Sequence, residues 1–252
     1  MQSQEIVLRE GQEIVSREAQ KIVSRKDWIT ARKELLEKEK EFTRLRDQLS
    51  DRRRQLPWVK IDESYEFEGQ GGTVSLSDLF DGRSQLIIYH FMFGPDWDEG
   101  CPSCSYIADH FDGAMTHLNH RDVTMVVVSR TPFERLDQYR KRMAWNFRWL
   151  SSLGSDFNFD YHVSFTGDDP ANDQVYYNYR TGTFPADEAP GISAFYKAEN
   201  GDAFHTYSCY GRGLDMLLGA YHIMDLTAKG RNEANLPYPM AWVRRHDQYG
   251  SE

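Results

Sequence analysis

The feature that most constrains the fold of this chain is an apolar run that leads through a short loop into a helix start. Residues 85–92 are almost continuously apolar, as expected for a central strand that is buried on both faces. A loop rich in Gly, Pro and Asp follows at 93–100, and Cys101-Pro-Ser-Cys104 then opens a helical pattern that runs to about His120. Because proline is favoured in a first helical turn, the pattern predicts a strand, a loop and a helix that begins with two cysteines.

The rest of the main domain alternates between strand and helix patterns. The Asn200-Gly201 dipeptide lies between two strand patterns and predicts a hairpin. The order is two strand–helix pairs, a third strand, a hairpin and a last helix, which predicts an α/β fold with a mixed sheet flanked by helices. The expected strands lie at 74–80 (with a helical step), 85–92, 123–128, 147–150, 192–197 and 203–208, and the expected later helices at 133–143 and 214–225.

The N-terminal part is predicted to be a separate region. Residues 1–23 are a repetitive extension: three near copies of one segment, at 4–10, 12–18 and 20–26, follow at a spacing of eight, which indicates a small tandem duplication. Residues 24–56 predict one long amphipathic helix that Pro57 ends and whose apolar residues recur every seven positions. Its apolar stripe could pack on the chain's own body or on a second copy, which would make a homodimer. Residues 57–252 form the main domain, with an irregular insertion at 152–189.

Composition excludes several classes of protein. Lys and Arg number 30 against 39 Asp and Glu, so the net charge of −9 argues against nucleic acid as a partner. No apolar run approaches the ~18 residues of a membrane span, and the first residues do not resemble a signal peptide. Three cysteines are too few for a disulfide scaffold. The expected compartment is therefore the reducing cytoplasm, where a close cysteine pair serves redox chemistry or metal binding.

The cysteine pair is the strongest chemical signal. The start of a helix favours a thiolate through its unpaired N–H groups and its dipole. A spacing of three residues places both sulfurs on one face of the helix. We expect Cys101 to be the more exposed, nucleophilic thiol and Cys104 the more buried, resolving thiol. Such exchange needs no metal or organic cofactor, only a protein or small-molecule disulfide or thiol and a cellular reductant.

Two other interpretations of the pair stay open. Cys101, Cys104, His110 and His117 would supply the four ligands of a zinc site, but one helix cannot easily direct all four side chains at one ion. The two thiols could also be inert core residues, because free cysteine packs well as a small hydrophobic side chain. The strand–loop–helix setting favours redox chemistry over both.

A proline after the insertion supports the redox interpretation. Pro190-Gly191 directly precedes the first strand of the predicted hairpin. In this arrangement the chain resembles the thioredoxin-like superfamily. The resemblance implies that Pro190 is a cis-proline that faces the cysteine pair and holds the substrate backbone. The alternative is an ordinary trans proline at a strand start.

Three longer stretches sharpen the resemblance. Residues 89–104, 154–160 and 239–246 resemble the bacterial family catalogued as domain of unknown function 899, and the likeness extends from about residue 20 to the end. It implies a dithiol–disulfide oxidoreductase with a thioredoxin-like, peroxiredoxin-related fold. A typical peroxiredoxin has Thr three residues before its reactive cysteine, where this chain has Asp98. Disulfide exchange is therefore favoured over a thiol peroxidase; a non-catalytic thioredoxin-like binding module is the further alternative.

Two more residues are candidates for binding the substrate. Trp97 resembles the aromatic residue that precedes thioredoxin-type motifs, although its spacing to the cysteines is longer. Arg130 follows the second buried strand at the sheet edge where ligands gather in α/β folds, and it either steadies an anion or forms an ion pair. We expect His90 to be a core histidine and Cys209 a buried bystander thiol.

Overall fold

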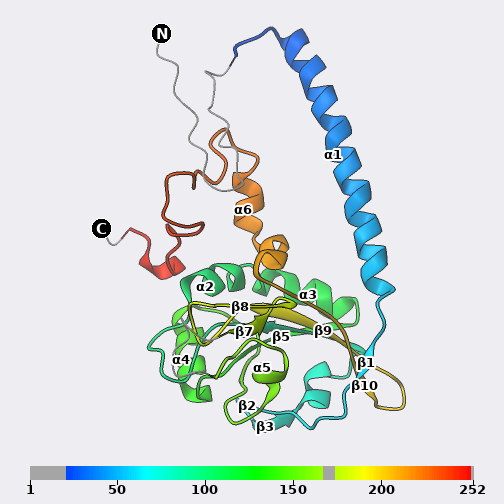
Figure 1. Cartoon of the computed structure of the whole chain (residues 1–252), viewed down its shortest axis with the longest axis vertical. Coiled ribbons are helices and arrows are strands. Elements are labelled where there is room, and N and C mark those ends of the chain that lie inside the picture. Colours follow the sequence, from blue (N-terminus) through cyan, green and yellow to red (C-terminus); the bar gives the residue numbers. More distant parts are fainter. Residues whose placement is uncertain (1–20, 167–173, 251–252) are drawn as a thin grey trace. The chain divides into compact units, whose positions relative to one another are not determined.

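The computed structural model describes residues 21–166 and 174–250 (Figure 1). The chain divides into two compact units, residues 1–56 and 57–252. The first two repeat copies and the first residue of the third lie outside the described residues. No helix in the described part of the chain combines the length and the apolar character needed to cross a membrane.

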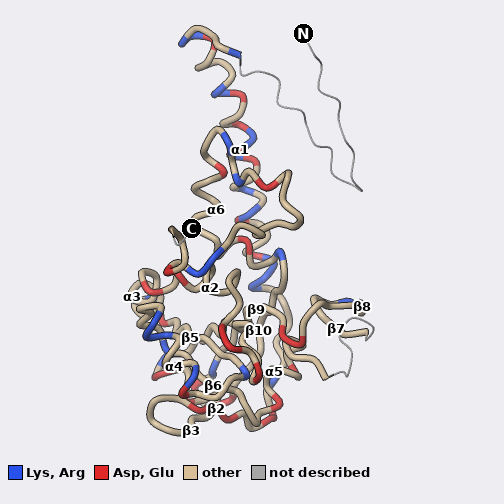
Figure 2. The backbone as a smooth tube through the Cα atoms, turned by 90° about the vertical axis from the view of Figure 1, so that its left-hand side faces the viewer, with Lys and Arg blue, Asp and Glu red and all other residues tan. Residues whose placement is uncertain are grey.

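The first unit contains the predicted long helix, α1 (Arg25–Arg54). Its N-terminus is capped as expected, because the Ser24 hydroxyl accepts a hydrogen bond from the Asp27 amide at 3.2 Å. Residues of both charge signs are interspersed along the helix (Figure 2), and none of its residues is buried. The apolar stripe, which includes Leu35 and Phe42, is exposed. Dimerisation through this stripe stays a prediction.

The second unit contains strands and short helices in alternation. Its strands are β1 (Val59–Lys60), β2 (Glu66–Gly69), β3 (Gly72–Ser75), β4 (Gln85–His90), β5 (Val123–Ser129), β6 (Trp149–Ser151), β7 (Val175–Tyr177), β8 (Arg180–Gly182), β9 (Gly191–Lys197) and β10 (Ala203–Tyr210). Its α-helices are α2 (Pro102–Ala108), α3 (Asp112–His120), α4 (Phe133–Arg142), α5 (Phe157–Asp160) and α6 (Gly219–Met224). Its 3-10 helices are η1 (Leu76–Phe80), η2 (Gly211–Leu217) and η3 (His246–Gln248).

One mixed sheet of eight described strands organises this unit, in the order β1-β10-β9-β4-β5-β6-β2-β3. Strand β4 is parallel to β5 and antiparallel to β9, and β10 pairs antiparallel with β9. A parallel strand pair joined by a helical crossover, with a hairpin on the other side of the first strand, is the thioredoxin-like arrangement. The expected α/β, thioredoxin-like fold is confirmed.

The sheet separates two hydrophobic cores. Along β4, Leu86 and Ile88 face one core, whereas Tyr89 on the alternating side faces the other. The first of these cores contains residues of η1 and α5, and the second contains residues of α2, α4 and the C-terminal segment. Figure 1 shows α2 and α3 on one side of the sheet and α5 on the other. The cysteine helix therefore packs on the Tyr89 face.

The single helix expected after the cysteine pair is in fact two helices, α2 and α3. At the break, the Asp109 carboxylate accepts a hydrogen bond from Trp145 Nε1 at 2.8 Å. The Asp112 carboxylate accepts from the backbone amides of Asn146 and Phe147 at 2.8 and 2.9 Å. Through these contacts, two acidic side chains at the break hold the segment at 145–147. Short polar residues that bond to backbone groups are common at helix ends.

The later segments agree with the expectations in part. The hairpin predicted around Asn200-Gly201 is present as β9 and β10. The last helix expected at 214–225 is divided at Leu218 into η2 and α6. The segment expected to be irregular at 152–189 contains α5 and the small β7–β8 hairpin.

His90, at the end of β4, is a core histidine as expected. Its Nε2 lies 2.8 Å from the Ser193 hydroxyl, which lies 2.8 Å from the Ser208 hydroxyl. Its Nδ1 has no hydrogen-bond partner among the described residues, and its ring stacks on Phe157 and Tyr161. Burial lowers the pKa of His90 to about 3, so the folded protein keeps this ring neutral.

We expect His90 to make the fold less stable as the pH falls. Its ring in the unfolded chain titrates at about 6.5 but stays neutral in the folded chain to about 3. Between these values the unfolded chain binds a proton that the folded chain does not, so stability rises with pH by at most ~1.4 kcal/mol per unit. Urea unfolding of His90→Gln at several pH values should show a shallower slope than the wild type. Identical slopes would contradict the assignment.

Candidate active site

The two cysteines lie where α2 starts, next to the end of β4. Cys101 is the residue that precedes α2, and Pro102 occupies its first position. The Cys101 amide donates to the Met92 carbonyl at 3.0 Å, which ties the loop to the strand end. The Cys101 carbonyl accepts from both the amide and the hydroxyl of Ser105, at 2.9 and 3.0 Å. Cys101 is therefore held through its amide by the end of the β4 segment and through its carbonyl by α2.

The two sulfurs have different environments. Cys104 is buried and Cys101 is half-buried, which is the order expected from their helix positions. A hydrogen bond from the Cys104 thiol, followed by the amides of Cys104 and Ser103, lowers the pKa of Cys101 to about 7 against the effect of burial. Burial, and then the neighbouring Cys101 sulfur, raises the pKa of Cys104 well above its ordinary value. Cys101 is thus the thiol that ionises first.

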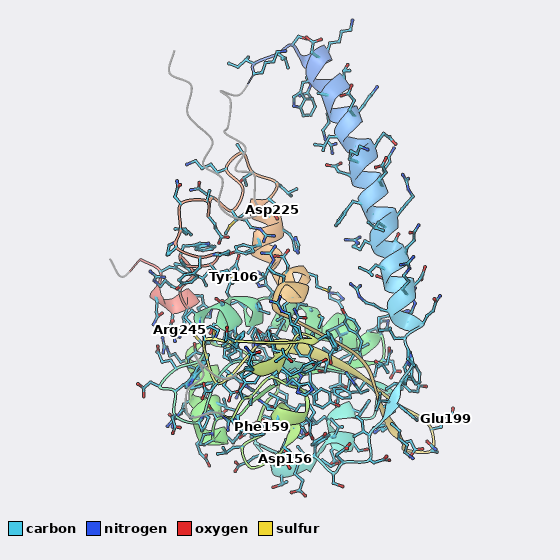
Figure 3. All side chains as sticks on the ribbon, in the orientation of Figure 1. Tyr106, Asp156, Phe159, Glu199, Asp225 and Arg245 are labelled. Atoms are coloured by element: carbon cyan, nitrogen blue, oxygen red, sulfur yellow. The ribbon has the colours of Figure 1, made fainter. Side chains whose placement is uncertain are left out.

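Arg245 holds Gly100, the residue before Cys101. Its Nη2 donates to the Gly100 carbonyl at 2.7 Å, and its Nε donates to the Tyr139 hydroxyl at 2.8 Å. That hydroxyl lies 3.0 Å from the Ser105 hydroxyl, so one network joins Arg245 to α2. Figure 3 shows Arg245 on the C-terminal segment next to α2. Its positive charge also contributes to the lowered pKa of Cys101.

An ion-pair network fixes Arg245 in place. Its Nη1 lies 2.7 Å from the Glu99 carboxylate, which also pairs with Arg142. Arg142 in turn pairs with Asp247 at 2.6 Å. The network links the cysteine loop, α4 and the C-terminal segment. Sequence reasoning did not single out Arg245, and the one signal for it is its place in the family-like stretch at 239–246.

Pro190 lies at the same end of the sheet as the cysteines. Its neighbour Gly191 pairs with His90 of β4. Its carbonyl accepts from the Tyr177 hydroxyl at 2.7 Å, and burial raises the pKa of that tyrosine. Pro190 thus lies where β9 pairs with the end of β4, the strand that leads into the cysteine loop.

The expectation of a cis peptide at Pro190 is wrong for this structure. The described residues contain no cis peptide bond, so the bond before Pro190 is trans. The trans alternative therefore describes the structure, and the chain before Pro190 pairs with residues 163 and 164. The Ala189 amide donates to the Val163 carbonyl at 2.8 Å, and Ser164 forms an antiparallel bridge with Glu188.

Trp97 and Arg130 both contact the segment that precedes Pro190. The Trp97 indole donates to the Asp187 carboxylate at 3.2 Å. Arg130 forms an ion pair with Glu188 at 2.8 Å. Of the two expectations for this arginine, an anion site or an ion pair, the structure shows the ion pair. Burial raises the pKa of Glu188, although Ser164 and Arg130 oppose the shift. The three candidate substrate residues therefore meet at one short segment.

The four residues of the alternative zinc site do not come together. Among the described residues, no three His, Cys, Asp or Glu side chains are arranged to hold a metal ion, so the four-ligand zinc set is not gathered. His110 Nε2 instead accepts from the Ala220 amide at 3.0 Å. Cys209 is buried in the same core as Cys104, with its sulfur 3.6 Å from the Gly213 carbonyl.

A family profile described as "Bacterial protein of unknown function (DUF899)" matches residues 17–249. The chain belongs to this family. The resemblance seen in the sequence is thereby confirmed, and it covers α1 as well as the thioredoxin-like unit. No curated protein matches the chain.

Solved structures similar to this chain are distant in sequence. A mutant of PrxQ from Xylella fastidiosa is 12% identical, with a TM-score of 0.42, and the match covers 66% of this chain and 94% of that one. Peroxidoxin BcpB from Mycobacterium tuberculosis is also 12% identical, with a TM-score of 0.42 and coverage of 65% and 94%. A putative thiol:disulfide interchange protein DsbE from Chlorobium tepidum is 13% identical, with a TM-score of 0.39 and coverage of 66% and 97%.

Removal of the Arg245 charge should raise the pKa of Cys101. Arg245→Gln removes a nearby cation and frees the Gly100 carbonyl, so the iodoacetamide reactivity of Cys101 should titrate above the wild-type midpoint of about 7. Arg244→Gln is the matched control, because Arg244 is exposed and donates to carbonyls of its own segment. Equal midpoints in wild type and Arg245→Gln would contradict the role of this arginine.

Proposed function

We propose that the protein is a thiol–disulfide oxidoreductase in which Cys101 is the nucleophile and Cys104 the resolving thiol. One observation carries the proposal: the more accessible sulfur lies at a helix start, and the buried second thiol, one turn further on, lowers its pKa. The helix start and the Arg245 charge favour its thiolate. A nucleophile that is ionised near neutral pH, beside a second thiol, is what disulfide exchange requires.

The reaction follows from this asymmetry. The Cys101 thiolate attacks one sulfur of a substrate disulfide, the substrate S–S bond breaks, and the departing thiolate takes a proton from solvent. Cys104 then loses its proton to solvent and attacks Cys101 Sγ. A Cys101–Cys104 disulfide forms, and the second substrate thiol leaves. A cellular thiol reductant returns the pair to the dithiol, so each cycle transfers two electrons.

The substrate is a protein or small-molecule disulfide that reaches the half-buried Cys101. We place its contacts at Trp97, Arg130 and Pro190, which meet beside the segment at 187–190. We assign the protein to the cytoplasm, where a reducing thiol pool can drive the cycle. Asp98 stands where a peroxiredoxin carries threonine, so we rank peroxide below disulfides as the oxidant.

Cysteine variants test the proposal. Cys101→Ser should abolish the reduction of insulin disulfides by dithiothreitol, because no nucleophile remains. Cys104→Ser should instead accumulate a mixed disulfide at Cys101, detectable by mass spectrometry, because the resolving step is lost. Cys209→Ser is the matched control and should retain activity.

Three results would contradict the proposal. Equal insulin reduction by the wild type and Cys101→Ser would exclude this cysteine as the nucleophile. Peroxide consumption that depends on Cys101, without insulin reduction, would assign the same site to a thiol peroxidase. Absence of both activities in the wild type would leave a binding module.

A further inference from the structure

Tyr89 places an unpaired hydroxyl inside the core beneath the cysteine pair. The residue is fully buried, and its hydroxyl has no hydrogen-bond partner of normal geometry among the described residues. Its ring is fixed by edge-on contacts with Phe91 and Phe111, with centroids 6.2 and 5.1 Å apart. An unpaired buried hydroxyl destabilises a fold, so its presence calls for a functional explanation.

Tyr89 and Cys104 belong to the same buried core. Cys104, and then Cys101, add to the raised pKa of Tyr89, and Tyr89 in turn acts to lower the pKa of Cys104. The Cys101 sulfur and the Met92 backbone also act on the pKa of Cys104. A neutral thiol is a weak acceptor, which explains why the hydroxyl makes no full hydrogen bond in the dithiol.

We propose that Tyr89 is a positioning residue for the resolving step, and that its hydroxyl donates a hydrogen bond to the Cys104 thiolate as this forms. A thiolate accepts hydrogen bonds far better than a thiol, so the unpaired hydroxyl gains its partner when Cys104 loses its proton, just before it attacks Cys101. This inference rests on the proposed function, since it concerns the second step of that exchange.

The proton balance of this step is simple. Cys104 releases its proton to solvent, and its sulfur displaces the leaving thiolate from Cys101 Sγ. Tyr89 keeps its own proton throughout, because burial raises its pKa well above the ordinary value. The tyrosine is therefore a donor to the nucleophile and not the base that deprotonates it.

The reaction of the dithiol with 5,5′-dithiobis(2-nitrobenzoate) tests this role in two phases. The first release of thionitrobenzoate reports attack by Cys101 and depends on reagent concentration. The second reports attack by Cys104 on the mixed disulfide, and it is independent of reagent concentration because it is intramolecular. Tyr89→Phe should leave the first phase unchanged and slow the second by about tenfold or more, as expected for the loss of a hydrogen bond to a charged group.

Tyr106→Phe is the matched control. Tyr106 is also a core tyrosine whose hydroxyl has no hydrogen-bond partner among the described residues, but it packs against Tyr221 and Trp242 (Tyr106 is labelled in Figure 3). This variant should show both phases at wild-type rates. Thermal unfolding of the disulfide form adds a readout: Tyr89→Phe should be at least as stable as the wild type, because it removes an unpaired hydroxyl.

The outcomes separate this inference from the proposed function. A wild-type protein without a concentration-independent second phase would overturn the dithiol mechanism itself. A normal second phase in Tyr89→Phe would overturn only the role of Tyr89, as would equal slowing in Tyr106→Phe. If Tyr89→Phe fails to fold, 3-fluorotyrosine at position 89 replaces it, because this residue is a stronger hydrogen-bond donor of nearly equal size. The rate of the second phase should then equal or exceed that of the wild type. A slower second phase would contradict the inference.

Discussion

The interaction between the two cysteine thiols at the start of α2 makes them chemically different. It lowers the pKa of Cys101, while burial raises the pKa of Cys104, so two identical groups differ in how readily they ionise. The asymmetry depends on placement: the half-buried sulfur precedes the helix, and the buried sulfur lies within its first turn.

The fold supplies that placement from distant parts of the chain. The end of β4 holds the Cys101 amide, and the C-terminal Arg245 holds the carbonyl of Gly100 on the other side. Ion pairs then fix the arginine against α4 and the cysteine loop. Residues near the end of the thioredoxin-like unit thus help to hold the cysteine loop, and they lie within the range that the family profile matches.

The parts of the structure that could be predicted are those that local patterns determine. The apolar run at 85–92, the Asn200-Gly201 turn and the Ser24 cap each lead to the observed element. The contacts made at the break between α2 and α3 could not be predicted, because Asp109 and Asp112 bond to residues far along the chain. The same holds for the hydrogen bonds of Arg245, which join the C-terminal segment to the cysteine loop.

A redox titration of the reduced protein, in glutathione buffers of defined potential with mass spectrometric readout, tests the central claim most directly. We expect one two-electron transition with a loss of two hydrogens, localised to the peptide that carries Cys101 and Cys104, while Cys209 stays a free thiol. The proposed dithiol chemistry is wrong if both cysteines remain thiols across the titration, or if the disulfide that forms joins either of them to Cys209.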